Sequence, residues 1–400
     1  MQAFSNIRVI DLTHVIAGPF CTYQLAVMGA DVIKIEPPHN PDMTRANGHD
    51  IPHGENGLGF SFTSQNANKR AIGLDIKSPK GKEVLTKLIE TADVLVENYR
   101  SGALAKLGLG YEDVKKIRPD IIYCSMTGFG QGGPKAQHTA YDNVIQAFSG
   151  LMEATGSSQT APMKVGPPVL DYGTGIQAAF AIAAALFQRT QTGEGQHIDV
   201  AMLDSAIMLM SANVTYYDQM GKLLGNSGNM SATNAGYSCY QTMDGLLMMG
   251  AFTGEQLKNM WCVLGDKEHG DELRSLQPPA MGKHVEKDTK RLAKLFMEKT
   301  AAEWEVIMNE NKVPAARVRK LDETLKHAQL QSRTLLQVPE DSSNDQKLPT
   351  ASFKYAENGP ALHRAPPMFA QHTRQILTEI GYSQSQISEL NREEIIATLD

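Results

Sequence analysis

The sequence of 400 residues contains few cysteines, two tryptophans and no excess of positive charge. The four cysteines, at positions 21, 124, 239 and 262, are far apart and form no CxxC pair. Neither a zinc site nor a disulfide framework is therefore expected. Lys and Arg number 38 against 44 Asp and Glu, so the formal net charge is -6. Because nucleic-acid binders usually carry a basic face, nucleic acid is not an expected partner.

Patterns typical of secretion, of membrane spans and of several enzyme classes are also missing. Residues 1–6 lack the charged-then-apolar pattern of a signal peptide, and the longest apolar run, residues 178–187, is too short for a membrane span. No HExxH, GxxxxGK-S/T or GxSxG motif occurs. These absences argue against zinc hydrolysis, a phosphate loop and a serine hydrolase of that type. We expect a cytoplasmic protein with no membrane partner and no metal.

Short apolar runs alternate with amphipathic helical patterns through the first half of the chain. This alternation is typical of an α/β fold with a mostly parallel, doubly wound sheet, in which ligands bind at the carboxyl ends of the strands. The expected strands are residues 7–12, 31–35, 72–76, 93–97, 120–125 and 197–201. The expected helices include residues 19–30, 78–92, 143–155, 173–189 and 203–209.

The composition changes near residue 222. Residues 225–236 are polar and rich in glycine, which predicts a loop or linker. A smaller α/β segment follows, with a possible hairpin at Asp244-Gly245 and charged helices within residues 283–311. Residues 340–345 resemble a second polar linker, and residues 371–399 have the pattern of short helices.

Asp171 is the first candidate for chemistry, because it stands just before the helix expected from Gly173. A helix N-terminus favours an ionised carboxylate, and such a carboxylate can attack an acyl group. Asp is also a common helix cap, so the local pattern alone leaves both roles open. Tyr141 is similarly either a hydrogen-bonding group in a site or a structural side chain.

His14 follows the first expected strand, where functional groups collect, and is either a site residue or a turn histidine. The glycine-rich turn at residues 128–133 superficially resembles a dinucleotide fingerprint, but no apolar helix pattern follows it, so a nicotinamide cofactor is not expected. Five cations beside expected strands are candidates for a phosphate site or ordinary surface charges: Lys69, Arg70, Lys77, Arg100 and Lys106.

Many short stretches, taken in order, resemble the class III CoA-transferases, or CaiB/BaiF family, which includes formyl-CoA and carnitine CoA-transferases. The resemblance covers nearly the whole chain. It rests on VIDLTH (9–14), AGP (17–19), GADVIKIE (29–36), NKR (68–70), LD (74–75), ADVLVEN (92–98), TGFG (127–130), AYD (140–142), QAFSG (146–150), GEGQHIDVAM (193–202) and QHT (371–373).

The resemblance implies a Rossmann-like large domain that binds CoA, a smaller inserted α/β domain and an interlocked homodimer. On this basis residues 1–221 are expected to form the first part of the large domain. Residues 222–339 are expected to form the small domain with its linkers, and residues 340–400 to return to the large domain.

The resemblance also implies the chemistry of the site. The family nucleophile is an aspartate that matches Asp171, and it carries acyl-anhydride and CoA-thioester intermediates while CoA passes from an acyl-CoA to a carboxylic acid. Tyr141 matches an active-site tyrosine, and His14 is placed with it in the site. The expected CoA contacts are Ile16, Ala17, Leu74, Asp75, Ile76, Lys77, Asn98, Tyr99, Arg100 and Lys106.

Two positions depart from formyl-CoA transferase: Pro37 stands where an arginine stacks on adenine, and Thr139 replaces a lysine. Oxalate or formate is therefore not the expected substrate. An α-methylacyl-CoA racemase is the alternative within the family, but its second base is a histidine at the position of Tyr141, and tyrosine is a poor base at neutral pH. A catalytically silent CoA-binding protein is the remaining alternative.

Overall fold

The computed structural model describes residues 1–46, 57–276 and 282–399. The chain forms two compact units. The first unit comprises Met1–Leu151, Lys164–Gly221 and Arg333–Asp400, and the second comprises Met152–Met163 and Lys222–Ser332. The second unit thus ends before the polar stretch at residues 340–345, because that stretch lies between the strands of a small antiparallel pair in the first unit, β10 (Leu336–Gln337) and β11 (Leu348–Pro349).

The first unit is built on a sheet with the strand order β12-β3-β2-β1-β4-β5-β6. All neighbouring strands are parallel except β12, which pairs antiparallel with β3. The chain leaves β1 toward β2 and later returns to the other side of β1 with β4, so the strand order reverses there. The strands are β1 (Arg8–Leu12), β2 (Asp31–Glu36), β3 (Arg70–Leu74), β4 (Val94–Glu97), β5 (Ile122–Thr127), β6 (Gln196–Ala201) and β12 (Ile396–Ala397).

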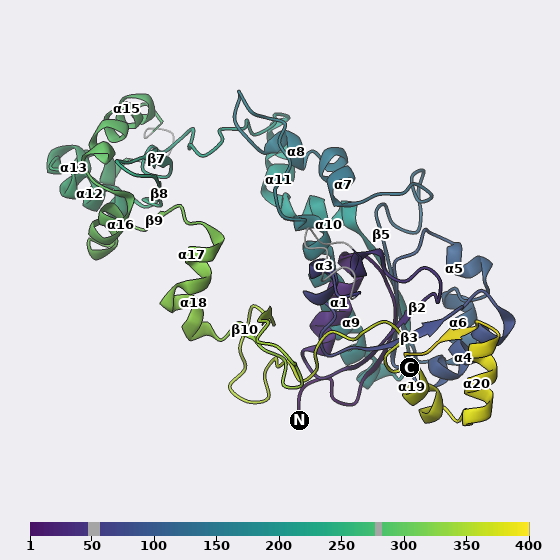
Figure 1. Ribbon diagram of the computed structural model, residues 1–400. Coiled ribbons are helices and arrows are strands. Elements are labelled where there is room, and N and C mark those ends of the chain that lie inside the picture. The colour runs from purple at the N-terminus through teal and green to yellow at the C-terminus, as the bar shows by residue number, and fades with distance from the viewer. Residues whose placement is uncertain (47–56, 277–281, 400) are drawn as a thin grey trace. The chain divides into compact units, whose positions relative to one another are not determined.

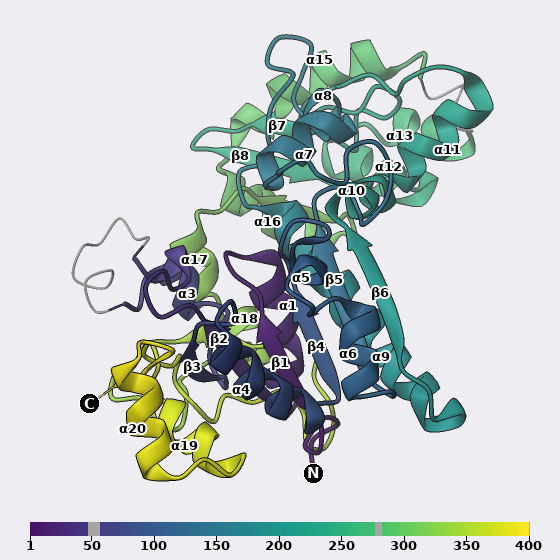
Figure 2. The same ribbon diagram turned by 90° about the vertical axis from the view of Figure 1, so that its right-hand side faces the viewer.

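Helices cover both faces of this sheet (Figure 1). One face carries α1 (Ala17–Ala26), α7 (Asp142–Ser149), α9 (Val169–Thr192) and α10 (Met202–Leu209). The other face, toward the viewer in Figure 2, carries α4 (Pro79–Glu90), α5 (Ala103–Lys106), α6 (Tyr111–Ile117), α19 (Thr373–Glu379) and α20 (Gln384–Arg392). The remaining helical segments of this unit are η1 (Met43–Arg45), α3 (Phe60–Thr63) and α11 (Ser211–Met220), and α8 (Leu151–Ala154) begins at the boundary.

Strand alternation explains why the sheet is covered on both sides. In β1, Ile10 and Leu12 pack into the core shared with α4, while Val9 packs into the core shared with α1 and α9. Successive side chains of a strand point to opposite faces, so a strand that is apolar at nearly every position needs two covering layers. The predicted α/β fold with a large, mostly parallel sheet is confirmed.

Helix α9 is long and apolar enough to cross a membrane by length and composition alone. The core helix of a folded domain passes the same test, and α9 packs Leu170, Ala178 and Ile182 into the core beneath α1. The length and apolar composition of α9 therefore fit a core helix that packs on the sheet as well as they fit a membrane span.

Three details differ from the sequence expectations. Helix α9 begins at Val169, so Asp171 lies inside its first turn instead of before it. The helical stretch expected at residues 143–155 is interrupted at Gly150, whose φ of 89° is a left-handed conformation that glycine adopts readily. The tail adds strand β12 after its two helices, because Ile396 pairs with Leu74 at the open edge of β3.

The second unit has a three-stranded antiparallel sheet in the order β7-β8-β9, packed against short helices around a core with Trp261, Phe296 and Trp304. The expected hairpin at Asp244-Gly245 joins β7 to β8. The strands are β7 (Cys239–Gln241), β8 (Leu246–Met249) and β9 (Ala315–Arg317). The helices are α12 (Gly254–Val263), α13 (Lys267–Ser275), α15 (Val285–Leu295), η2 (Phe296–Glu298), α16 (Ala301–Glu310), α17 (Leu321–Lys326) and α18 (Ala328–Arg333).

Candidate active site

A cavity of about 560 Å³ lies at the carboxyl ends of β1, β2, β4 and β5 in the first unit. Its volume falls in the range of small-molecule sites, roughly 300–1,000 Å³. It lies where the strand order reverses between β1 and β4, which is the usual position of a ligand in an open parallel sheet. Asp171, Tyr141 and His14, the three expected catalytic residues, all line it.

Asp171 lies where two helix N-termini converge. It belongs to the first turn of α9, and its carboxylate accepts a hydrogen bond from the backbone N–H of Ala17, the first residue of α1. The free N–H groups and the dipole at a helix start favour negative charge. The same features stabilise an oxyanion that forms on this side chain or beside it.

A second carboxylate, Asp142, lies behind Asp171. Asp142 is 5% exposed, and its Oδ2 accepts hydrogen bonds from the backbone N–H groups of Leu170 (2.7 Å) and Asp171 (3.2 Å). Its Oδ1 accepts a short hydrogen bond from Gln146, whose amide oxygen accepts the N–H of Val165 at 2.9 Å. Asp142 therefore caps α9 from outside the helix and holds the chain that leads into Asp171.

These surroundings raise the pKa of Asp171 to about 7. Burial is the largest cause, and the negative charge of Asp142 acts in the same direction, while the hydrogen bond from Ala17 lowers the pKa. A carboxylate with a pKa near neutrality is a stronger base and nucleophile than an ordinary aspartate, and it is still partly ionised at pH 7.

A glycine allows α1 and α9 to approach closely enough for the contact between Ala17 and Asp171. A Cβ built on Gly175, one turn after Asp171, would lie 2.8 Å from the carbonyl oxygen of Ala17 and 3.0 Å from the ring of Phe20. Any side chain at this position would push the two helices apart, so Gly175 is required for the geometry of the carboxylate.

The loop between β1 and α1 is strained and held in place by polar side chains. Val15 has a φ of 71°, a left-handed conformation that is a genuine outlier for a β-branched residue. The side chain of Asn98 holds the residue before Val15: it accepts the N–H of His14 (3.0 Å) and donates to the carbonyl of His14 (2.8 Å). The N–H of Val15 bonds to Asp42 (3.2 Å), and its carbonyl accepts from Gln65 (3.0 Å).

A buried ionic network supports this loop from below. Lys34 pairs with Asp42 at 3.1 Å and also donates to the carbonyl of Thr13 at 2.8 Å. Lys69 pairs with Asp11 at 3.0 Å and donates to the carbonyl of Pro19 in α1 at 2.9 Å. All four charged side chains are buried, so each charge depends on its partner.

His14 is a half-buried neighbour of this network. Its ring makes an edge contact with Tyr99 at a centroid distance of 5.4 Å. Burial is the main cause that lowers its pKa, so the imidazole is neutral at pH 7. A neutral imidazole can accept or donate a proton in the cavity without adding a fixed charge.

Tyr141 also lines the cavity and is 57% exposed. It is the residue immediately before α7, and its carbonyl accepts the N–H groups of Val144 and Ile145. Gly128 explains its placement, because a Cβ there would lie 2.6 Å from the Cβ of Ala140, the neighbour of Tyr141. The first glycine of the turn after β5 therefore allows close packing against Ala140.

The residues expected to contact CoA fall into two groups. Five of them line the cavity: Ile16, Ala17, Asn98, Tyr99 and Arg100. The other five do not line it: Leu74, Asp75, Ile76, Lys77 and Lys106. Leu74 and Ile76 are buried in the core, whereas Lys77 and Lys106 are exposed at the same edge of the sheet. Pro37 and Thr139 both line the cavity.

Two candidate phosphate-binding cations have structural roles. Lys69 is fully buried on Asp11, and the Arg70 guanidinium bonds to both Asp31 (2.7 Å) and Glu379 (2.7 Å). Both the phosphate-binding and the surface-charge interpretations are wrong for these residues, because the two cations close ion pairs inside the fold. Arg100, in contrast, faces the cavity.

Sequence reasoning missed three residues of the site. Asp142 stands next to Tyr141 in the AYD stretch, so its position was a usable signal. For Asp42 and Thr174 the sequence contains no such signal. Thr174 is buried in the cavity wall one turn after Asp171, and its hydroxyl is one of the few buried side-chain polar groups without a hydrogen-bond partner within the described parts of the chain.

Comparison with known proteins agrees with this geometry. Residues 4–373 match CoA-transferase family III. The chain belongs to CoA-transferase family III. It is 33% identical over 392 residues to succinyl-CoA:glutarate CoA-transferase of Mus musculus, covering 98% of this chain and 89% of the relative. It is 35% identical over 382 residues to succinate–glutarate CoA-transferase of Agrobacterium fabrum, covering 94% and 95%.

The solved structures agree with this family assignment. A CaiB/BaiF family protein from Brucella suis superposes with a TM-score of 0.83 at 29% identity, covering 95% of this chain and 99% of that one. The predicted membership of the class III CoA-transferases is thus confirmed, and the chain is an enzyme of this type. CoA thioesters are the substrates of CoA-transferases, which confirms the expected substrate class.

Proposed function

We propose that this family III enzyme transfers CoA from an acyl-CoA thioester to a carboxylic acid through covalent intermediates on Asp171. The observation that carries the proposal is the position of that carboxylate. It is partly buried, faces a cavity of ligand size, has a pKa near neutrality and touches a backbone N–H at the start of α1. A nucleophile and a donor for the developing oxyanion are thereby adjacent.

The first half-reaction removes CoA from the donor. One oxygen of Asp171 attacks the thioester carbonyl, the C–S bond breaks, and CoA leaves as a thiolate, which gives an aspartyl–acyl anhydride. The thiolate then attacks the aspartyl carbonyl of the anhydride. The donor acid leaves as a carboxylate, and Asp171 carries CoA as a thioester.

The second half-reaction repeats these steps with the acceptor. The acceptor carboxylate attacks the aspartyl thioester and releases the thiolate, forming a second anhydride. The thiolate attacks the acceptor carbonyl, which yields the new acyl-CoA and restores the Asp171 carboxylate. Both anhydrides hydrolyse in water, so the buried side of the cavity favours transfer over loss.

The cavity supplies several groups for these steps. The N–H of Ala17 and the hydroxyl of Thr174 are the donors that we assign to the oxygen of the tetrahedral intermediates, because both flank Asp171. We propose that Tyr141 and the neutral imidazole of His14 contact the acyl groups on the open side of the carboxylate. We place CoA along the carboxyl edge of the sheet, from the segment 74–77 after β3 to Arg100 and Lys106 after β4.

Relatives suggest the chemical class of the two acids. Two relatives named for succinate and glutarate cover at least 94% of this chain. We therefore propose succinyl-CoA as a donor and a small dicarboxylic acid as the acceptor. His138 also lines the cavity, and its ring N–H can donate a hydrogen bond to a second carboxylate.

The decisive experiment uses a panel of acyl-CoA donors and carboxylic acids, read by mass spectrometry of products and of the intact protein. We expect a new acyl-CoA only when both substrates are present, and a covalent adduct on the peptide that contains Asp171 when the donor is present alone. Asp171→Ala should bind CoA and form no adduct. Normal transfer by that variant would overturn the proposal.

The same samples in deuterated water separate the racemase from the transferase. Exchange of the α-hydrogen of a 2-methylacyl-CoA, in the absence of an acceptor acid, would identify a racemase. We expect no exchange, because Tyr141 occupies the position of the second base. A protein that binds CoA but gives neither transfer nor exchange would be the silent alternative.

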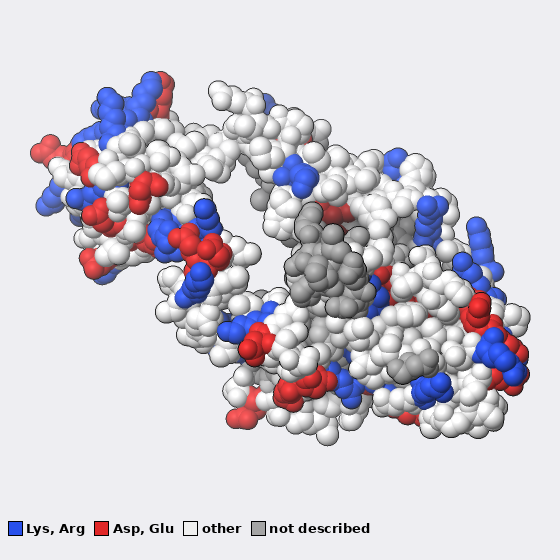
Figure 3. Space-filling view, viewed as in Figure 1, with Lys and Arg blue, Asp and Glu red and all other residues white. Residues whose placement is uncertain are grey.

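We also propose that the enzyme is a homodimer. Within the first unit, one surface formed by α9, α10 and α11 exposes large apolar side chains: Ile176, Phe180, Phe187, Met208, Leu209, Val214, Tyr217 and Met220. The region over α11 carries few charged side chains in Figure 3, whereas acidic and basic side chains are interspersed on the visible face of the second unit. Exposed apolar patches of this kind mark protein interfaces. Light scattering should give twice the chain mass, and Phe180→Glu should shift it toward the monomer.

A further inference from the structure

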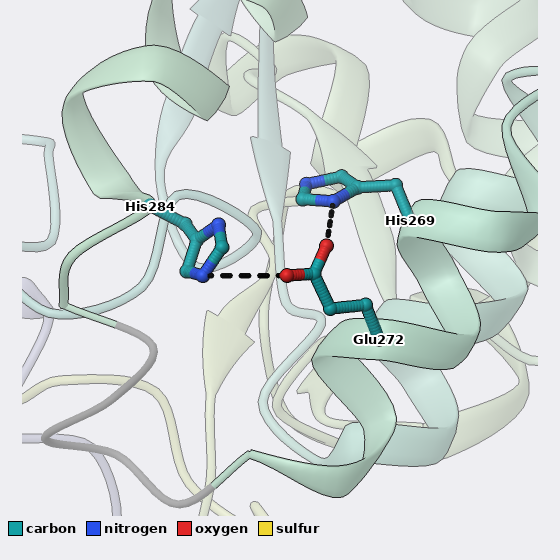
Figure 4. Close-up of side chains that lie close together, drawn as sticks. All are labelled: His269, Glu272 and His284. Atoms are coloured by element: carbon teal, nitrogen blue, oxygen red, sulfur yellow. Dashed lines mark hydrogen bonds and ion pairs between the residues drawn. The ribbon is translucent and has the colours of Figure 1, made fainter.

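Two histidines and a glutamate meet in the second unit. His269 and Glu272 lie three residues apart on α13 and therefore share one face of that helix, and His284 precedes α15 (Figure 4). The Nδ1 of His269 lies 3.1 Å from Oε2 of Glu272, and the Nε2 of His284 lies 3.8 Å from its Oε1. The three ligand atoms all lie within 4.8 Å of one another.

The second nitrogen of His269 is held by a buried carboxylate. Its Nε2 lies 2.9 Å and 3.0 Å from the two oxygens of Asp288, which is 3% exposed. Because a carboxylate only accepts hydrogen bonds, this contact places a proton on Nε2 and leaves Nδ1, which faces Glu272 and His284, as the nitrogen that a metal ion would bind. A carboxylate behind a histidine is the usual outer support of a metal-binding imidazole.

We propose that His269, Glu272 and His284 bind a divalent transition-metal ion, with Zn²⁺ as the expected occupant. Two imidazole nitrogens and one carboxylate oxygen form a mixed donor set that suits Zn²⁺, with water at the fourth position. Tetrahedral zinc places its ligand atoms about 3.3 Å apart. The observed spacings reach this geometry by rotation of Glu272 and His284, which are the more exposed members of the cluster.

Such an ion would fasten α13 to the start of α15. The two helices are already linked beside the cluster by Arg291 of α15, which donates to Asp266 at 2.6 Å. Asp266 also caps α13 by accepting the N–H of His269 at 3.0 Å. The ion would therefore add to an existing brace, and its effect would be on the stability of the second unit.

This proposal departs from the sequence expectation of no metal. The spacing from His269 through Glu272 to His284 matches no short zinc motif. The cluster exists only because the fold brings the start of α15 to α13, and because Asp288 directs one ring.

Zinc titration of the full-length protein, stripped with a chelator and desalted, tests the proposal by calorimetry. We expect one Zn²⁺ per chain with a Kd below about 1 μM. Glu272→Gln and His284→Ala should each weaken Zn²⁺ binding by at least about 100-fold. Loss of a residue that only supports a ligand costs up to about 100-fold, and loss of a direct ligand should cost no less. Glu268→Gln removes the same charge from the exposed part of the same helix and should bind as the parent does.

A second readout separates a built site from loose surface binding. Co²⁺ replaces Zn²⁺ in such sites, and its visible absorption reports the number of ligands. We expect the spectrum of a four-coordinate ion in the parent protein and in Glu268→Gln, and its loss in His284→Ala. The proposal is overturned if the parent binds no Zn²⁺, or if Glu272→Gln and His284→Ala bind it as tightly as the parent.

Discussion

Two groups of charges lie beside the cavity, and they are built on opposite principles. Below the loop after β1, Lys34 with Asp42 and Lys69 with Asp11 form balanced pairs that are fully buried. At the start of α9, Asp142 and Asp171 place two carboxylates together with no cation between them among the described residues. The balanced group holds backbone in place, while the unbalanced group leaves one carboxylate with an altered pKa.

The difference shows how the fold separates scaffold from chemistry. A buried pair whose charges cancel fixes geometry, because removing either partner strands the other. A carboxylate pair does the reverse: the inner member accepts backbone N–H groups, and the outer member is left with a raised pKa and an exposed face toward the cavity. Breaking each group should therefore give different results.

The largest effect is expected from Asp171. Asp171→Ala should lower kcat by at least about 10⁴-fold, since removal of a covalent nucleophile eliminates the pathway. Steady-state transfer with the best donor and acceptor measures it. An unchanged KM for the acyl-CoA would show that the cavity still binds its substrate.

Asp171 should also influence stability with a sign opposite to that of most carboxylates. Its folded pKa of about 7 exceeds the unfolded value near 3.8, so the folded state binds the extra proton and loses stability as pH rises through about 7. Asp171→Asn should therefore raise Tm more at pH 8 than at pH 5. An equal gain at both values would contradict the raised pKa.

Breaking the balanced group should mainly cost stability. Asp42→Ala leaves Lys34 buried without its nearest carboxylate and frees the N–H of Val15, so we expect a loss of about 3–5 kcal/mol in the free energy of unfolding. Chemical denaturation measures this loss. A change below about 1 kcal/mol would show that the other carboxylates near Lys34, Asp11 and Glu36, compensate its charge.

Asp42→Asn serves as the matched variant, because the amide keeps an acceptor for Val15 without the charge. The pKa of Asp42 is lowered to about 2 by Lys34 and by Thr44, against the opposing effect of burial. The parent should therefore lose stability as pH falls from about 4 to 2, and Asp42→Asn should lack this part of the acid dependence.

Thr174 tests the donors beside the nucleophile. Thr174→Val removes an unpaired hydroxyl at nearly constant volume, so folding should be retained while kcat falls about 10²-fold, the lower end for one oxyanion donor. Thr174→Ser keeps the hydroxyl and should restore most of the rate. Equal rates for Thr174→Val and Thr174→Ser would show that Thr174 contributes only to packing.

The smallest effect is expected from Asp142, and it tests the difference between the two groups of charges most directly. Asp142→Asn removes the second negative charge and keeps an acceptor for the N–H groups of Leu170 and Asp171, so the pKa of Asp171 should fall. The rise of kcat/KM with pH should move to lower pH by the same amount. Glu97, whose burial raises its pKa to about 7, also titrates there, and Glu97→Gln should leave this shift unchanged.

Much of the fold followed from local patterns, because each strand of the large sheet is a short apolar run bounded by turns. The six expected strands of the parallel sheet are present with shifts of a few residues at their ends. Strand β12 was not predictable in this way. Its two residues are strand only because β3 offers an open edge, and that edge is a tertiary feature.

The site was predictable where a residue stands in a recognisable stretch and not where it acts through packing. Asp171, Tyr141 and His14 were expected together, and they line one cavity. Lys69 and Arg70 were misjudged, because local sequence does not show that Asp11, Asp31 and Glu379 would meet them inside the fold. The cluster around His269 has the same origin in helix packing.

Val15 carries a consequence for laboratory evolution of this enzyme. A valine held at a φ of 71° costs about 1–3 kcal/mol, and glycine would relieve this strain while losing more conformational entropy on folding. Selection for heat tolerance should accept Val15→Gly where the relieved strain exceeds this entropy, whereas selection for turnover should reject it, because glycine gives the loop before Ala17 access to other conformations. Thermal stability and turnover therefore make opposite demands on position 15. Libraries screened by melting temperature should be screened again for rate before this residue is chosen.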